Sequence, residues 1–158
     1  MVYALLKLLH WAAIIIWLGG MVFAHFCLRP AAAALPPPQR LPLMADALGR
    51  FLNIVAGLVL VTLATGAGMW GWAVRSTHQT GTPFNAPADW YVMAGLGVLM
   101  ALVYGHIRFA LYRRLQRAVA AQEWPAGGAA LQEIRFWVSA NMVFGAIILA
   151  VVSLGQAS

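Results

Sequence analysis

The chain has 158 residues, enough for one domain, but hydrophobic residues make up 63% of it and charged residues only 9%. Soluble domains are roughly 45–50% apolar and about 25% charged, so this composition excludes soluble enzymes, nucleic-acid-binding domains and disordered proteins. Ten Lys and Arg against four Asp and Glu give a net charge of +6, and the single cysteine excludes an internal disulfide or a CxxC motif. The composition indicates a membrane protein, and the positive net charge does not require a nucleic-acid partner to explain it.

Four apolar runs are each long enough to cross a bilayer, which takes about 20 residues. In chain order they predict helices at about residues 2–28, 47–74, 90–117 and 132–155. Backbone groups in lipid must form their hydrogen bonds within the segment, which favours helices over open strands. The sequence therefore predicts an all-α membrane protein, a four-transmembrane-helix bundle in which residues 1–158 form a single domain.

The linkers between these runs set the expected topology. Residues 29–45 contain five prolines, residues 75–89 are polar and turn-rich, and residues 118–130 contain a proline and two consecutive glycines. Eight of the ten basic residues flank the first and third linkers, whereas only Lys7 and Arg75 belong to the other side. The positive-inside rule then places both termini outside, on the periplasmic side of a bacterial inner membrane.

Histidines are the main candidates for chemistry. His10, His25 and His106 lie in predicted helices, and His78 lies in the polar second linker. An ionisable residue inside a membrane is a functional hypothesis by default. The acidic residues lie at or beyond helix ends, which excludes paired-carboxylate catalysis within the membrane: Asp46, Asp89, Glu123 and Glu133. A histidine that only hydrogen-bonds a neighbouring helix remains the alternative for each position.

Depth along the helices suggests how the histidines are grouped. His25 and His106 are expected within about 4 Å of the same depth on two different helices, an arrangement that fits the two axial positions of a heme. Leu99 and Leu102 share the apolar face of His106, as a macrocycle pocket or an ordinary bundle core would require. His10 lies in the outer leaflet, on one stripe with Trp17 and Met21, and has His78 as one candidate partner for a second site.

A family resemblance rests on short motifs along nearly the whole chain. The first helix reads Leu5-Leu6-Lys7-Leu8-Leu9-His10 and then Trp17-Leu18-Gly19-Gly20, and the second begins at Arg50 with Asn53 and Ile54 and continues to Ala64-Thr65-Gly66. These motifs resemble the CopD family, a membrane domain linked to copper resistance and uptake. They also resemble the related HemJ-type protoporphyrinogen oxidases.

The resemblance to the oxidases implies heme b held by the first-helix histidine, here His10, and a role for the arginine that opens the second helix, here Arg50. The chain departs from those oxidases where a lysine is expected in the third helix, at Tyr91–Gly95, and where an arginine is expected near His25. Retention of their oxidase activity is therefore left open. CopD proteins imply copper uptake instead.

Three functions follow as expectations. The first is a heme b protein with one or two hemes that carries electrons or performs redox chemistry on a tetrapyrrole, and so acts as a membrane oxidoreductase. Its site residues are His10, His25, His106, Trp17 and Arg50, and its partner is a quinone or a redox protein. The second is copper handling through His10, His78 and scattered methionines, which are soft ligands suited to copper. The third is a non-catalytic membrane scaffold or assembly subunit, and each of the three is compatible with a homo-oligomer.

Overall fold

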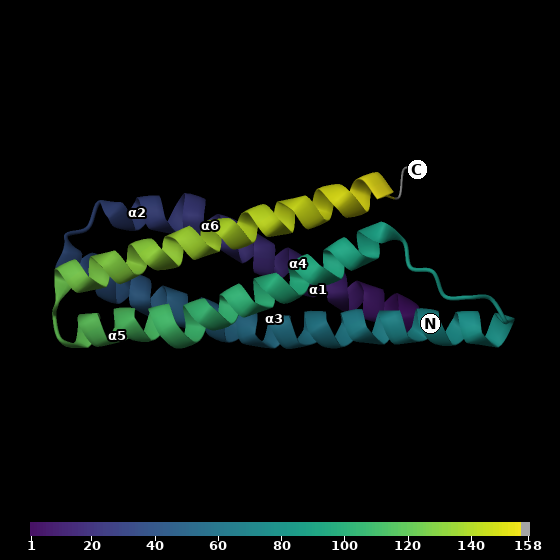
Figure 1. The fold of residues 1–158 in the computed structure, drawn as a ribbon. Helices are drawn as coiled ribbons and strands as arrows, with labels where there is room; N and C mark the ends of the chain where they lie inside the picture. Colours follow the sequence, from purple (N-terminus) through teal and green to yellow (C-terminus); the bar gives the residue numbers. More distant parts are fainter. Residues whose placement is uncertain (156–158) are drawn as a thin grey trace.

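The structure is a computed structural model that describes residues 1–155. Over this part of the chain it is all-helical and contains no strand (Figure 1). Four long helical segments follow one another, two of them interrupted by a π-helical turn. The elements are α1 (Val2–Phe23), η1 (Ala24–Leu28) and α2 (Arg29–Ala33); α3 (Pro37–Thr80); α4 (Ala88–His106), η2 (Ile107–Leu111) and α5 (Tyr112–Ala120); and α6 (Trp124–Gly155).

All four segments are long and apolar enough to cross a membrane. Large apolar side chains face outward on each of them: Ile15 is 63% exposed, Leu60 69%, Leu102 66% and Phe136 66%. A surface of this kind is unfavourable in water and favourable against lipid tails. Together with the four spans, it makes the chain a multi-pass membrane protein.

The helices extend beyond the apolar runs that predict them, most clearly at the first linker. Residues 29–45 were expected to be non-helical, but only residues 34–36 leave the helical path. Pro37 and Pro38 occupy the first turn of α3, where the missing N–H has no partner to lose. Pro30 is the second residue of α2, just after η1, whose wider turn already interrupts the regular bonding pattern. Most prolines of this region are therefore accommodated in helical turns, and the break is limited to residues 34–36.

The other two connections are also shorter than expected. Helix α3 continues to Thr80, so His78 lies on its last turn and not in a loop. The helix ends at Gly81, whose φ of 69° is left-handed, and the Thr82 N–H donates back to the Thr77 carbonyl over 3.1 Å. Residues 81–87 connect α3 to α4, and residues 121–123 connect α5 to α6.

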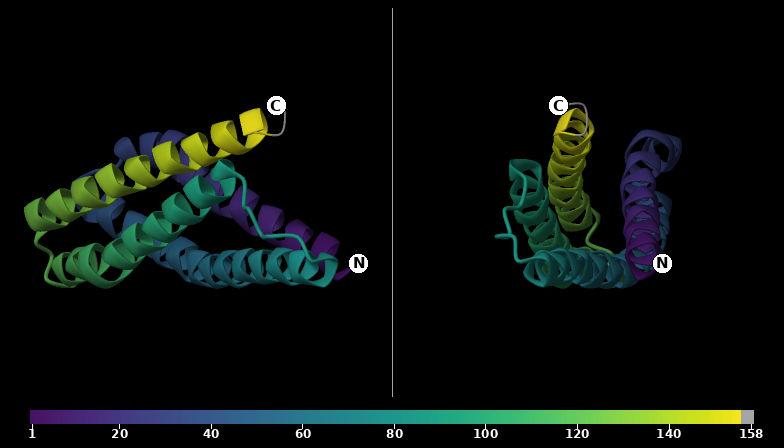
Figure 2. Two further views of the ribbon diagram at one scale, coloured as in Figure 1. Left: turned by 45° about the vertical axis from the view of Figure 1, so that its right-hand side comes forward. Right: turned by 90° about the vertical axis from the view of Figure 1, so that its right-hand side faces the viewer.

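The four segments form two antiparallel pairs. Helix α1 packs along α3, and α6 packs along α4 and α5. Connections 34–36 and 121–123 lie at one end of the molecule, here called the turn end (Figure 1). Residue 1, residues 81–87 and the last turn of α6 lie at the opposite end, here called the terminus end. The pairs are close together near the turn end and diverge toward the terminus end (Figure 2).

Two buried tyrosines connect the pairs in the half nearer the turn end. The Tyr104 hydroxyl donates to the Leu52 carbonyl over 3.0 Å, and the Tyr112 hydroxyl donates to the Ala45 carbonyl over 3.0 Å. The most deeply buried apolar side chains lie in the same core: Leu41, Val55, Leu115 and Ile134. In the terminus-end half, which contains His10, the pairs touch through aromatic rings: the Trp70 centroid on α3 lies 5.9 Å from that of Trp90 and 5.3 Å from that of Tyr91 on α4.

Candidate functional site

His10 is the one histidine buried in the described part of the chain, at 9% exposure. It lies on α1, and its Nδ1 is 2.9 Å from the Thr65 hydroxyl oxygen on α3. That hydroxyl donates its own proton to the Val61 carbonyl over 2.6 Å. Since the hydroxyl proton is used there, Thr65 accepts from His10, which assigns the proton to Nδ1. In this tautomer Nε2 is the ring nitrogen that carries a lone pair.

The surroundings of His10 come from one face of α3. Gly66 lies against the ring, where a Cβ would be at ordinary contact distance, 3.4 Å from His10 Cε1. Thr62 lies one turn before Thr65, and its buried Oγ1 has no hydrogen-bond partner within residues 1–155. Met69 lies one turn after Thr65 on the same face. The Thr65 hydroxyl thus holds the imidazole, and a thioether lies one turn further along the same helix face.

Two aromatic side chains border this region along α1. Trp17, predicted to pack against a cofactor, is buried at 5% exposure in the apolar core with Met21. Tyr3 stacks on Trp72 of α3 with ring centroids 4.8 Å apart. The region around His10 is therefore closed by helix packing on the core side and by an aromatic pair toward the terminus end.

His25 and His106, expected to face one another across the bundle, both contact α6. His25 Nδ1 lies 3.4 Å from the Ser139 hydroxyl, and the His106 ring lies 5.4 Å from the Trp137 ring. Positions 137 and 139 are separated by about 200° around a helix, so the two imidazoles touch different sides of α6. No hydrogen bond or ring contact among residues 1–155 joins one imidazole to the other.

The α4 face that carries His106 is divided between surface and core. His106 is exposed, and Leu99 and Leu102 are 40% and 66% exposed, whereas Val103 is 6% exposed and packs in the core. The whole face was expected to line a pocket or a bundle core, and most of it lies on the molecular surface instead. An almost uniformly apolar helix provides no periodicity to separate its lipid-facing side from its core side.

His78 is exposed near the terminus end of α3. It lies nine residues from Met69, about 180° around the helix, and therefore on the opposite side of α3 from His10. The structure does not bring together the two histidines of the expected outer site.

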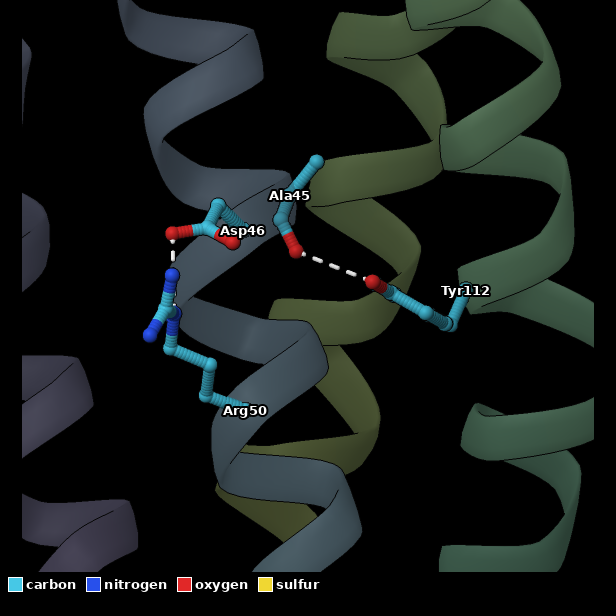
Figure 3. A network of polar contacts seen from close by, with 4 residues as sticks. All are labelled: Ala45, Asp46, Arg50 and Tyr112. Carbon is cyan, nitrogen blue, oxygen red and sulfur yellow. Dashed lines mark hydrogen bonds and ion pairs between the residues drawn. The ribbon is translucent and has the colours of Figure 1, made fainter.

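Arg50 lies on the surface of α3 in the half nearer the turn end. Its Nε donates to Asp46 Oδ2 over 3.0 Å, beside the bond from Tyr112 to Ala45 (Figure 3). Both partners of this ion pair are largely exposed, so it contributes little to stability. Arg50 and Asp46 line a polar cleft of about 340 Å³, together with Asn53 and Arg108, whose side chains are joined by a 3.0 Å hydrogen bond.

One polar residue of the core was missed from the sequence. Asn141 on α6 is 1% exposed, and its amide donates to the Met100 carbonyl on α4 over 3.2 Å. Its Oδ1 has no partner within residues 1–155. A single asparagine within the uncharged run after Arg135 was the available signal, because a buried amide in lipid needs a partner on a neighbouring helix.

The described residues contain no group of three or more His, Cys, Asp or Glu side chains able to hold a metal ion together. A metal bound in this part of the chain would need one histidine with softer or backbone ligands. His10 best meets this condition, since it is buried and its Nδ1 is held by the Thr65 hydroxyl.

Comparison with known proteins identifies one family. The family described as copper resistance protein D (CopD) matches residues 45–154, which cover α3 from its third turn through nearly all of α6. No curated protein and no solved structure is similar to the chain. The match spans more than half of the sequence, and the chain belongs to the CopD family.

Proposed function

We propose that this protein handles copper as cargo in the inner membrane of a bacterium, and that His10 is a ligand of the transferred ion. The observation that carries the proposal is the buried His10 imidazole whose Nδ1 is bound to Thr65, which leaves Nε2 as the ring nitrogen with a lone pair. Metal-binding histidines ordinarily donate their other ring N–H to an acceptor that fixes the tautomer. Membership of the copper resistance family supports copper as the metal.

Met69 completes the proposed pair of ligands. It lies between Thr65 and Trp72, two α3 residues whose side chains contact α1. Thioether and imidazole ligands suit Cu(I), which does not require a carboxylate or a thiolate. A site with two protein ligands also suits transport, because an ion that must leave again has to be bound weakly.

The direct test measures Cu(I) affinity of the purified full chain by competition with a coloured Cu(I) chelator under reducing conditions. His10→Ala should abolish competition, and Met69→Leu should weaken it while preserving side-chain volume. The matched controls are His78→Ala, on the opposite side of α3, and Met93→Leu on α4; both should bind as the parent does.

Two results would contradict the proposal. Equal Cu(I) affinity of His10→Ala and parent protein would remove His10 as a ligand. A purified protein with a Soret band that shifts on reduction, and that His10→Ala lacks, would assign His10 to heme instead. Copper tolerance of cells expressing the same variants then connects binding to function, with the His78→Ala cells expected to match the parent.

A further inference from the structure

Each membrane-spanning segment carries one arginine at the border of its uncharged run on the turn-end side. These residues are Arg29, Arg50, Arg108 and Arg135. Phe51–Val74 and Phe136–Gly155 begin next to two of them and contain no charged residue. Charges at such borders lie at the level of the lipid headgroups, because the hydrocarbon core excludes them.

Helix α3 separates the four arginines into two clefts of different character. On one side, Arg50 and Arg108 share the polar cleft with Asp46, which neutralises part of their charge. On the other side, Arg29 and Arg135 line a second cleft, formed by η1, α2, α3 and α6, that also includes His25 and no carboxylate.

The positive charge of this second cleft is uncompensated. Neither Arg29 nor Arg135 forms an ion pair within residues 1–155; the two ion pairs found there join Arg50 to Asp46 and Arg114 to Glu133. Two guanidinium groups lining one cleft at the edge of a low-dielectric region repel one another unless an anion lies between them. Guanidinium groups match the oxygens of phosphate in a bidentate manner.

The remaining lining of the cleft is apolar. Seven side chains form it: Ala24, Met44, Leu48, Phe51, Leu131, Ile134 and Val138. The cleft volume is about 40 Å³, which limits the enclosed part of a ligand to a small group. Beside it, the exposed Phe26 ring lies 4.7 Å from the His25 ring and extends the apolar surface toward lipid. A ligand that has both an anionic group and an apolar part therefore fits this cleft better than a free ion does.

We infer that this cleft binds the phosphate of an anionic phospholipid through Arg29 and Arg135, with the first part of the lipid lying against the apolar wall. The inference is independent of copper binding, because the cleft lies nearer the turn end and shares no residue with the His10 region. The same phosphate chemistry is offered by free inorganic phosphate, and the experiment separates the two sources.

The test uses the full chain in neutral detergent and follows the rise in melting temperature on titration with phosphatidylglycerol, phosphatidylcholine or inorganic phosphate. Only phosphatidylglycerol should produce a saturable rise. Arg29→Gln with Arg135→Gln should weaken its apparent affinity about fivefold or more per arginine, the change expected for one basic group at an anionic surface. Arg113→Gln with Arg117→Gln removes the same charge outside the cleft, where about 0.15 M salt screens the effect, and should leave the affinity close to that of the parent.

The single variant Arg135→Lys is a second test that stays informative if the double variant does not fold. It keeps the positive charge and loses the bidentate geometry. We expect it to fold and to bind phosphatidylglycerol more weakly than the parent does. Equal losses in the cleft variant and the Arg113 and Arg117 variant would overturn the inference, since general charge attraction would then explain both. A full rise with inorganic phosphate alone would also overturn it, because the lipid would contribute nothing.

Discussion

At the scale of single residues, substitutions at Thr65 test whether the His10 imidazole is a metal ligand or only a packing residue. Thr65→Val keeps the shape of the side chain and removes the oxygen that accepts from Nδ1. The ring then loses its fixed tautomer and orientation, and we expect Cu(I) affinity to fall by about 10- to 100-fold, as for other supporting partners of metal ligands. Chelator competition measures this change.

Thr65→Ser is the matched control, because the serine hydroxyl can make the same two hydrogen bonds. We expect it to keep most of the parent's affinity. A loss of equal size in the valine and serine variants would point to altered packing of α1 against α3 and would remove the hydroxyl from the proposed site.

The sequence predicts individual site residues better than it predicts their partners. His10 stands out because a histidine in the middle of an apolar helix needs a polar contact. Thr65 cannot be paired with it from the sequence, since nothing in the pattern shows which helix lies beside α1. His106 was expected to face inward, but its helix is apolar on every side, and hydrophobicity does not distinguish lipid from core.

At the scale of helices, two adjacent glycines of α1 test how closely it packs on α3. A Cβ at Gly20 would overlap the ring of Phe51, whereas a Cβ at Gly19 would meet nothing within 4 Å. We expect Gly20→Ala to destabilise the protein by about 1–3 kcal/mol, as overpacking does. Gly19→Ala should be neutral or slightly stabilising, since alanine favours a helix.

Unfolding in detergent, followed by loss of helical circular dichroism, measures both glycine variants. The comparison controls for composition and position, because the two residues are neighbours on one helix. Equal stabilities for the two alanine variants would mean that α1 does not approach α3 as the structure has it.

The two tyrosines that connect the helix pairs make a second prediction at this scale. Tyr104→Phe and Tyr112→Phe each remove one buried hydroxyl that donates to an α3 carbonyl. We expect each change to cost about 0.5–1.5 kcal/mol, the usual net value of such a bond. Tyr91→Phe is the control, because Tyr91 is 57% exposed, and it should leave the melting temperature unchanged. A similar loss in all three variants would contradict the assigned bonds.

The presence of four membrane-spanning helical segments was predictable from the sequence, whereas the residues at which they begin and end were not. The apolar runs gave the four segments because only helices satisfy their own backbone in lipid. Their ends lie beyond the apolar runs, where prolines and polar residues suggested loops. Pro37 and Pro38 are compatible with the first turn of a helix, and Thr77 and Thr80 continue α3 with hydroxyls that donate to carbonyls three residues back on the same helix.

At the scale of the whole molecule, two helix pairs joined near the turn end explain why core and candidate site lie apart. Most deeply buried apolar residues lie nearer the turn end, and the pairs diverge away from it (Figure 2). The His10 ring contacts α3, and α4 reaches this half of α3 through the rings of Trp90 and Tyr91 against Trp70. An ion entering from the terminus end would have to pass the Tyr3–Trp72 ring pair, but not the packed core, to reach His10.

The last prediction concerns the orientation of this asymmetric molecule in the membrane. Connections 34–36 and 121–123 share the turn end, and the eight basic residues that flank them lie on that half: Arg29, Arg40, Arg50, Arg108, Arg113, Arg114, Arg117 and Arg135. Because basic residues are retained on the cytoplasmic side, we expect the turn end in the cytoplasm and both termini in the periplasm. Alkaline phosphatase fused after the last residue should then be active, and green fluorescent protein at the same place should not fluoresce. The reverse pattern would place the His10 region toward the cytoplasm and would make the proposed copper path begin inside the cell.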